Sequence, residues 1–321
     1  MKIRLHILTA WILIAVAHRA EAQLPPMYEQ FNMNQLTFNP GYAGSTGVLD
    51  ANFFFHRNAV NFGNGSPGTE AITLHTPLAN DKVGLGAKVY RDNIGVTTAN
   101  FIGLDYAYRI HVSDNLTASI GLEASISSYS VDVTELDAYN GGDPSFTQEL
   151  ESYLKPNAGA GIYLHSDSYY VGVSSVSLFG LAPTNADEKV GDKTNQSFDD
   201  VFVLYGTAGA LVPINKKLAF KPNVLIKMAD SLPTQIDAGI QAIYNNAFLI
   251  GATYRTNNSL SFVGEYIYNS DNKITRHEIG IGYSFNTSLV DDGIYLAPSH
   301  EIFIIYRFDR HNNHFVNPRF F

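Results

Sequence analysis

The sequence predicts an all-β fold, an antiparallel transmembrane β-barrel of about 14 strands in a bacterial outer membrane. Three observations support this prediction. The chain opens with an export signal, most of it alternates apolar and polar residues, and its connections are short at one end of the strands and long at the other. Alternation with a period of two indicates β-strands. A closed barrel satisfies every backbone polar group in lipid without helices.

Residues 1–22 are predicted to be a secretory signal peptide. Lys2 and Arg4 precede the apolar run ILTAWILIAVA, and AEA at Ala20 to Ala22 offers a small-residue cleavage site. Cleavage removes three basic residues and one acidic residue, which leaves 18 basic and 29 acidic residues and a net charge of −11. Such an acidic chain is a poor candidate for nucleic-acid binding, and without cysteine it has no thiolate or disulfide chemistry.

The barrel is predicted over residues 48–309, followed by a tail at 310–321 on the periplasmic side. No apolar run after residue 22 approaches the roughly 18 to 20 residues of a membrane-spanning helix. Strands are expected at 48–57, 68–76, 83–91, 97–111, 115–131, 154–165, 169–179, 199–213, 217–229, 234–244, 247–256, 259–269, 274–286 and 299–309.

The connections sort by length. Six short ones (PLANDK, HVSDN, HSDS, PINKK, YNNA and NSDNK) are rich in turn-forming residues. The connections between them include long ones at 132–153, 180–198 and 287–298. Outer-membrane barrels place short turns in the periplasm and long loops outside the cell. This pattern predicts the orientation of the barrel and its location in the outer membrane.

Each strand is expected to turn one apolar face to lipid and one polar face to the lumen. In LTASIGLEASIS (116–127), Ile120 and Leu122 belong to the apolar face and Ser119 and Glu123 to the polar face. The charged residues predicted to line the lumen are Lys88, Asp105, Arg109, Glu123, Lys221, Lys227, Asp237, Arg255, Glu265, Arg276, Glu278, Glu301 and Arg307. Seven are basic and six acidic, which favours paired charges over a one-signed, ion-selective lining.

No catalytic, cofactor or metal site is predicted. His277 lies between Arg276 and Glu278, but in a strand it faces away from both neighbours. No G-x-S-x-G motif singles out a serine. The acidic stretches at 140–144, 185–192 and 291–293 lack the spacing of an EF-hand, so solvated loop acids are favoured over a calcium site.

The segment before the first strand, residues 23–47, is expected to be a periplasmic or lumenal element. Its large apolar and aromatic residues are too many for a free tail, because each gains roughly 1.5–3 kcal/mol on burial. We expect it to fold back into the periplasmic mouth or the lumen, and a short extra strand or cap is the alternative. The large residues are Tyr28, Phe31, Leu36, Phe38 and Tyr42.

The same segment carries a resemblance to a known family. QFNMNQLTFNPGYAGS (30–45) resembles the start of mature PorP/SprF proteins, in which Asn-Pro-Ala-Tyr-Ala-Gly is typical; here Gly41 replaces the alanine. Further similar stretches are LHTPLANDKVGLGAKVYRDNIGVTT (74–98), KPNAGAGIYLHSDSYYVGVS (155–174) and the closing NPRFF. One departure is HRNAVNF (56–62), which has Arg57 but lacks the tryptophan that family members commonly place there.

The resemblance implies a non-enzymatic outer-membrane barrel of the type IX secretion system of Bacteroidota. Such proteins are thought to support secretion or surface anchoring of a cognate cargo, such as a gliding adhesin, that bears a type IX C-terminal sorting domain. Some relatives are linked to a periplasmic peptidoglycan-binding lipoprotein. The residues that the resemblance suggests for partner binding are Phe38, Pro40, Tyr42 and Arg57. Two alternatives stay open: a passive channel or small-solute transporter, and a hydrolase built on His277.

Overall fold

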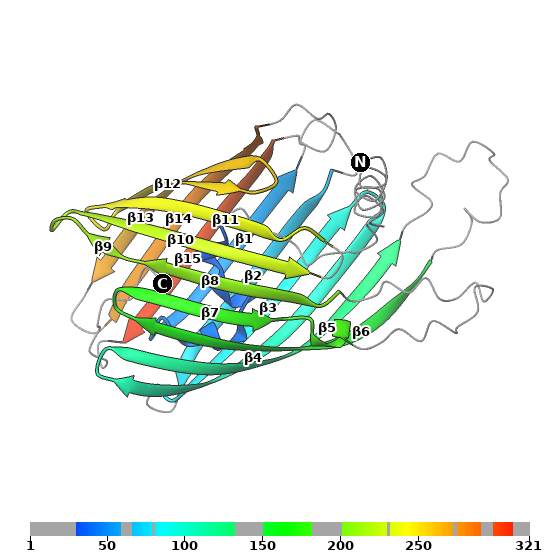
Figure 1. The fold of residues 1–321 in the computed structure, drawn as a ribbon, viewed down its shortest axis with the longest axis horizontal. Helices are drawn as coiled ribbons and strands as arrows, with labels where there is room; N and C mark the ends of the chain where they lie inside the picture. The colour runs from blue at the N-terminus through cyan, green and yellow to red at the C-terminus, as the bar shows by residue number, and fades with distance from the viewer. Residues whose placement is uncertain are drawn as a thin grey trace, which may run out of the picture.

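The computed structural model is a closed antiparallel β-barrel (Figure 1). It describes residues 30–58, 66–78, 81–131, 150–181, 201–229, 232–271, 275–289 and 298–310. The strands are β1 (Leu49–Asn58), β2 (Gly68–Leu78), β3 (Val83–Ile94), β4 (Thr97–Ser113), β5 (Leu116–Val131), β6 (Leu150–Ser166), β7 (Tyr169–Ser175), β8 (Val203–Ala210), β9 (Val212–Pro213), β10 (Leu218–Ala229), β11 (Gln235–Tyr244), β12 (Phe248–Arg255), β13 (Ser259–Asp271), β14 (Thr275–Ser288) and β15 (Ser299–Arg310).

The wall consists of fourteen strands, as the sequence predicts. Strands β8 and β9 both pair with β10, so they are two pieces of one wall strand interrupted at Leu211. The first and last strands of the chain, β1 and β15, pair along their length, and the β10–β11 pairing completes the ring. The predicted fold class is therefore confirmed. Among the helical turns that the structure describes, none has the length and apolar character of a membrane-crossing helix.

Most predicted strand ends differ from the structure by a few residues, and two ranges also include residues that are not in strands. The range 169–179 is too long, because β7 ends at Ser175 and a 3₁₀ turn, η7, follows at Leu178–Leu181. The range 199–213 begins too early and misses the break at Leu211. The Ser177 hydroxyl donates a hydrogen bond to the Val201 carbonyl at 2.8 Å, which ties the two chain segments beyond the ends of β7 and β8. Alternating residue types cannot distinguish such a turn from a strand.

The two ends of the barrel differ in their connections. We call one the turn end, because the six short connections beginning after β2, β4, β6, β9, β11 and β13 gather there. The other is the loop end, which carries the connections at 132–149 and 176–202. Of the four described non-glycine residues with positive φ, three lie in turn-end connections, namely Asp81, Asn245 and Asn246. Asparagine and aspartate tolerate this backbone conformation better than other residues.

The two faces of the wall differ in chemistry. Outward side chains are apolar and exposed, as at Leu104, Ile120 and Ile250. The thirteen charged residues predicted for the lumen all lie at inward positions; eleven are buried, and Arg276 and Arg307 are half-buried. The first half of β5 shows the same division between faces, because Ser119 and Glu123 are buried on the inner face.

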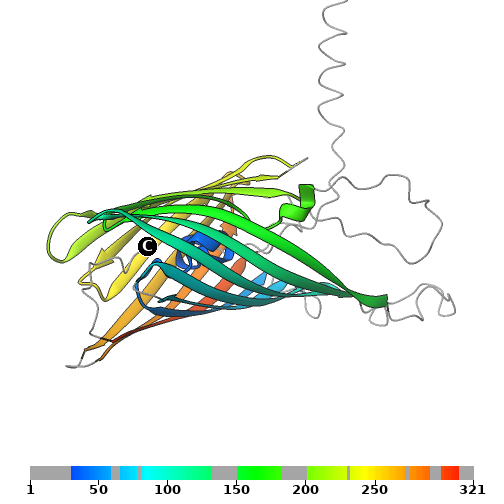
Figure 2. The ribbon, with the colours of Figure 1, turned by 90° about the horizontal axis from the view of Figure 1, so that it is seen from below.

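Residues 30–47 lie inside the barrel and form an element that we call the plug (Figure 2). It consists of three short 3₁₀ turns, η1 (Phe31–Met33), η2 (Gln35–Thr37) and η3 (Pro40–Tyr42). The Asn39 side chain accepts a hydrogen bond from the Gly41 amide at 2.8 Å, and Pro40 occupies the first position of η3. Both features favour the start of a helical turn. Residues 30–46 are all buried.

Candidate functional site

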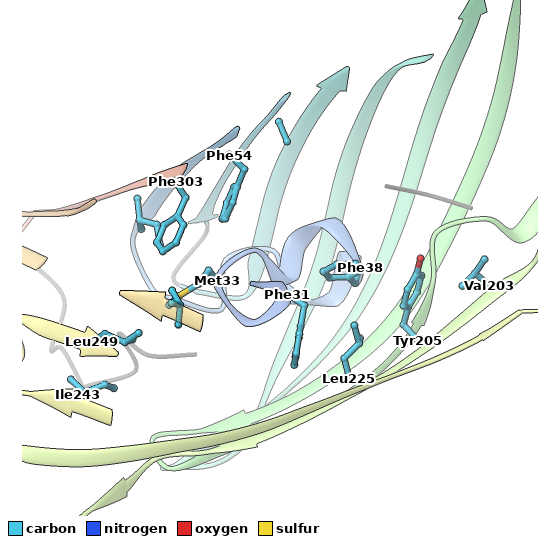
Figure 3. Close-up of a cluster of buried hydrophobic side chains, with 13 residues drawn as sticks. Phe31, Met33, Phe38, Phe54, Val203, Tyr205, Leu225, Ile243, Leu249 and Phe303 are labelled. Carbon is cyan, nitrogen blue, oxygen red and sulfur yellow. The ribbon is translucent and has the colours of Figure 1, made fainter. Parts of the chain in front are cut away.

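The first half of the plug packs on an apolar patch of the lumen (Figure 3). Phe38 meets Tyr205 with ring centroids 5.3 Å apart, and the wall residues Phe54 and Phe303 stack at 5.6 Å. Each large side chain buried in this cluster contributes roughly 1.5–3 kcal/mol. The cluster comprises Phe31, Met33, Phe38, Phe54, Ala71, Val203, Tyr205, Leu225, Ile243, Leu249, Val263, Phe303 and Ile305. The lumen is thus only partly polar, which the sequence-based assignment of a polar inner face missed.

The second half of the plug rests on glycines of the wall. A Cβ atom at Gly84 would collide with the Ala43 carbonyl, and one at Gly121 would collide with the Gly41 amide. A Cβ atom at Gly161 would collide with the Asn39 side chain. These wall glycines occupy inward positions on β3, β5 and β6, so they form a track into which the plug backbone fits. Glycine is needed here because only it permits such close backbone approach.

Hydrogen bonds fix the plug backbone against the track. The Asn39 amide group donates to the Ile162 carbonyl at 3.0 Å, and the Ser174 hydroxyl donates to the Phe38 carbonyl at 2.7 Å. These bonds satisfy plug groups that burial would otherwise leave without a partner.

Further hydrogen bonds hold both ends of the plug. Near its start, the Thr73 hydroxyl donates to the Asn34 side-chain oxygen at 3.0 Å. Near its end, the Gly44 amide donates to Nδ1 of His75 at 3.2 Å, which requires the tautomer with an unprotonated Nδ1. Both wall partners lie on β2, so the two ends of the plug are tied to the same strand.

A charge cluster connects the plug to the wall at η2. The Lys88 ammonium lies 2.6 Å from a Glu123 carboxylate oxygen and 3.4 Å from an Asp105 oxygen. It also donates a hydrogen bond to the Leu36 carbonyl of the plug at 3.0 Å. All three charged side chains are buried. One positive charge faces two negative ones here, so Lys88 neutralises the two wall carboxylates only in part. The same ammonium group also holds the plug through the Leu36 carbonyl.

Other lumenal charges are also paired across strands. The Arg307 guanidinium lies 2.7 Å from an oxygen of Asp50 and 2.7 Å from an oxygen of Glu278. Arg255 and Asp237 pair at 3.0 Å. Asp50 was not among the charged residues predicted to line the lumen. It is buried next to the end of the plug. Pairing makes these charges tolerable in a restricted interior.

Tyr42 closes the plug against the wall. Its ring meets His75 edge-on at 5.0 Å and Tyr163 edge-on at 5.3 Å. Burial, together with the nearby Asp50 carboxylate, raises the pKa of Tyr42 well above its usual value. The side chain therefore stays a neutral phenol at physiological pH and acts through packing.

The residues suggested for partner binding do not form one site. Phe38, Pro40 and Tyr42 lie together in the plug, and all three are buried. Arg57 lies elsewhere, near the loop end of β1, where it pairs with Glu70 at 3.3 Å and covers the Phe55 ring at 4.9 Å. A shared surface that includes Arg57 and the plug residues is therefore not present in this structure.

The structure offers no support for chemistry at His277. Its ring points outward, and Nδ1 lies 2.9 Å from the Tyr306 hydroxyl, away from Arg276 and Glu278. Among the described residues, no group of three or more histidines, aspartates or glutamates is arranged to hold a metal ion. The acidic stretches at 140–144, 185–192 and 291–293 lie outside the described residues, as does the signal peptide.

Sequence reasoning missed the residues that seat the plug. The alternation of residues along the strands could have indicated a close approach. Gly84, Gly121 and Gly161 occupy inner-face positions where a polar or charged side chain is expected. Inward glycines on neighbouring strands indicate a close approach by another chain segment. Asn39 was expected only as part of a turn with Pro40 and Gly41, and its hydrogen bond to the wall at Ile162 was not predicted.

A family model and several solved structures match this chain. The family model of the type IX secretion system membrane protein PorP/SprF matches residues 20–306. Similar solved structures include the CymD monoaromatic hydrocarbon channel, at 11% identity, with a TM-score of 0.49 and coverage of 90% of this chain and 94% of that chain. The Pseudomonas putida toluene transporter TodX gives 11% identity, a TM-score of 0.42 and coverage of 92% and 96%.

A third similar structure is the KdgM porin, at 8% identity, with a TM-score of 0.35 and coverage of 81% and 99%. A search of curated proteins found no match. The structural likenesses are distant, so family membership rests on the match over most of the chain. This chain belongs to the PorP/SprF family of type IX secretion system membrane proteins and is an outer-membrane β-barrel.

Proposed function

We propose that this chain is a non-enzymatic barrel that supports the secretion or surface anchoring of a cognate cargo protein. The observation that carries the proposal is the plug, a peptide segment that the lumen holds along a glycine track. A wall built to seat one peptide segment inside the barrel has the features needed to bind another. The type IX family of the chain agrees with a role in protein export.

The plug also argues against a permanently open channel. It contacts β3 to β7 through η2 and η3, while Met33 and Phe31 reach the apolar cluster that includes Leu225, Ile243 and Leu249. It therefore crosses the lumen from one wall to the opposite one. The paired charges near it lack the single sign expected of an ion-selective lining.

The partner in this proposal is a secreted cargo bearing a type IX C-terminal sorting domain. A periplasmic peptidoglycan-binding lipoprotein is a second proposed partner, at the turn end. Because Phe38, Pro40 and Tyr42 are buried, they contact a partner only when the plug moves. The resting structure thus presents the closed state, and partner binding selects a state with the plug displaced.

Deleting residues 30–44 tests the proposal. The wall strands are hydrogen-bonded to one another around the whole ring, so the variant is expected to assemble in the outer membrane. In planar bilayers it should conduct more than the intact protein. In cells that carry it in place of the native gene, surface proteomics should show the loss of one or a few surface proteins.

A matched variant controls for the loss of chain length. Replacing residues 30–44 with a glycine–serine linker of equal length should reproduce the deletion, because it preserves the tether without the side chains that seat the plug. A steady open pore in the intact protein, with an unchanged surface proteome in the deletion, would instead identify a passive channel.

A further inference from the structure

Two rows of inward side chains lie between the plug and the turn end, across β4, β5 and β6. Strand register places Arg109 opposite Ser119. One step nearer the turn end, Thr117 lies opposite His111 on one side and His165 on the other. Residues directly opposite each other in an antiparallel sheet have Cβ atoms about 4.5–5.5 Å apart. These side chains are therefore close neighbours.

Arg109 is a buried cation that forms no ion pair within the part of the chain that the structure describes. It is 5% exposed, and its Nε and Nη1 atoms have no hydrogen-bond partner among the described residues. Asp81, in the adjoining turn, acts on it only through space and forms no ion pair with it. Ser119 Oγ and His165 Nε2 also have no partner within the described ranges.

A buried guanidinium without a counter-charge is costly. The Lys227 ammonium is also without a hydrogen-bond partner among the described residues. Three other lumenal cations are ion-paired, namely Lys88, Arg255 and Arg307. Polar groups that pair poorly within their own fold often mark a site that receives a ligand. His165 lies on the other side of β5 from Arg109, opposite Thr117 in the adjoining inward row.

The plug covers this group of side chains on the side away from the turn end. Gly121 is the next inward position of β5 above Ser119, and Gly41 of the plug lies directly against it. On the other side, His111 is exposed at the mouth of the barrel. A molecule that enters from the turn end therefore reaches Arg109 before it reaches the plug.

We propose that Arg109, Ser119 and His165 bind a carboxylate carried by a peptide segment that enters from the turn end. The planar guanidinium matches a carboxylate with two parallel hydrogen bonds. The serine hydroxyl and the imidazole add two further donors. A peptide fits because the adjoining glycine track already holds one, the plug. This inference rests on the proposed function, since it gives the chemistry by which the incoming partner is held.

Binding of a short acidic peptide to the purified full-length mature barrel tests the site. The one tryptophan of the chain, Trp11, lies in the predicted signal peptide, so the fluorescence anisotropy of a tryptophan in the peptide reports on the peptide alone. A glycine–serine peptide with two glutamates should bind at least ten-fold more tightly than its glutamine counterpart. Arg109→Gln should abolish that difference.

Arg91→Gln is the matched control, because it removes the same charge from an exposed position of β3 near the loop end. It should keep the ten-fold preference. Equal binding of the two peptides, or an unchanged preference in Arg109→Gln, would overturn the site. Full competition by millimolar inorganic phosphate would overturn the peptide assignment in favour of a free oxyanion. Ser119→Ala, a smaller change, should weaken the preference several-fold without threatening the fold.

A stability measurement separates binding from a structural role. Urea-induced unfolding of Arg109→Gln should occur at the same or a higher urea concentration, because the variant loses an unpaired buried charge. A clear drop would mean that Arg109 supports the fold and would overturn the inference. Failure of the proposed function would give a different result from failure of this site. The preference for the glutamate peptide would persist, while the plug deletion would leave the surface proteome unchanged.

Discussion

Lys88 shows how one side chain can serve both the wall and the plug. Its ammonium group contacts Asp105, Glu123 and the Leu36 carbonyl in a buried part of the lumen. Lys88→Met would leave two carboxylates buried without a cation. We expect a loss of about 3–5 kcal/mol in the free energy of unfolding, the usual effect of breaking a buried pair. Urea unfolding of the barrel in lipid vesicles measures it.

A triple variant provides the control for this prediction. Adding Asp105→Asn and Glu123→Gln to Lys88→Met removes the stranded charges and should recover most of the loss. Lys217→Met, in an exposed turn, should leave the unfolding midpoint unchanged. If the single Lys88 variant is as stable as the native protein, the cluster does not hold the wall.

Gly121 matters because of what lies against it. Gly121→Ala places a methyl group where the Gly41 amide of the plug lies, so the plug should leave its seat while the strands remain paired. We expect higher conductance in planar bilayers and cleavage of residues 30–47 by a protease added to the purified barrel. Gly264→Ala, at an outward position with open space, should behave like the native protein. Native-like conductance in Gly121→Ala would show that the track does not fix the plug.

At the scale of the element, successive side chains of each strand point alternately to the lipid and to the lumen. Ile120 is 53% exposed on the outer face of β5, so Ile120→Arg puts a charge into lipid. Near the bilayer midplane this costs about 2–4 kcal/mol, whereas near an interface the cost falls to about 0–1 kcal/mol. Leu154→Arg, an outward position near the loop end of β6, should therefore be much milder. Equal destabilisation of the two variants in vesicle refolding would mean that the bilayer does not cross β5 at Ile120.

The plug is an element of another kind, because its turns have no stability of their own. Three 3₁₀ turns of three residues each are too short to fold alone in water. Their conformation depends on the wall through the apolar cluster, the glycine track and the Lys88 contact. A segment held by such distributed contacts can move as a unit once several of them are replaced by a partner, which is the behaviour that the proposed function requires.

At the scale of the whole molecule, the sorting of the connections fixes an orientation that can be tested in cells. The turn end should face the periplasm and the loop end the exterior. A protease added to intact cells should cut within 132–149 and 182–200 and spare residues 165–168 in the β6–β7 turn. Permeabilising the outer membrane should expose the turn-end sites. Cleavage at 165–168 in sealed cells would reverse the orientation.

The sequence by itself predicted the export signal, and it determined the strands, their two faces and the fourteen-stranded closed barrel. These features follow from residue types at short range: alternation along a strand, turn-forming residues between strands, and the absence of a spanning helix. The inward positions of Lys88 and Glu123 were predictable for the same reason. Their pairing was not, because it depends on which strands are neighbours and in which register.

Only the tertiary structure decided where the plug sits and what holds it. Arg307 and Asp50 pair across 257 positions of sequence, and Ser174 meets Phe38 across 136. The first contact arises from closure of the barrel, which brings β1 and β15 together, and the second arises because the plug lies inside the lumen. The track glycines indicate that some chain segment approaches closely, but they do not identify that segment. Their role appears only when a segment from before the first strand lies against β3, β5 and β6, because close packing of backbones is a property of the assembled fold.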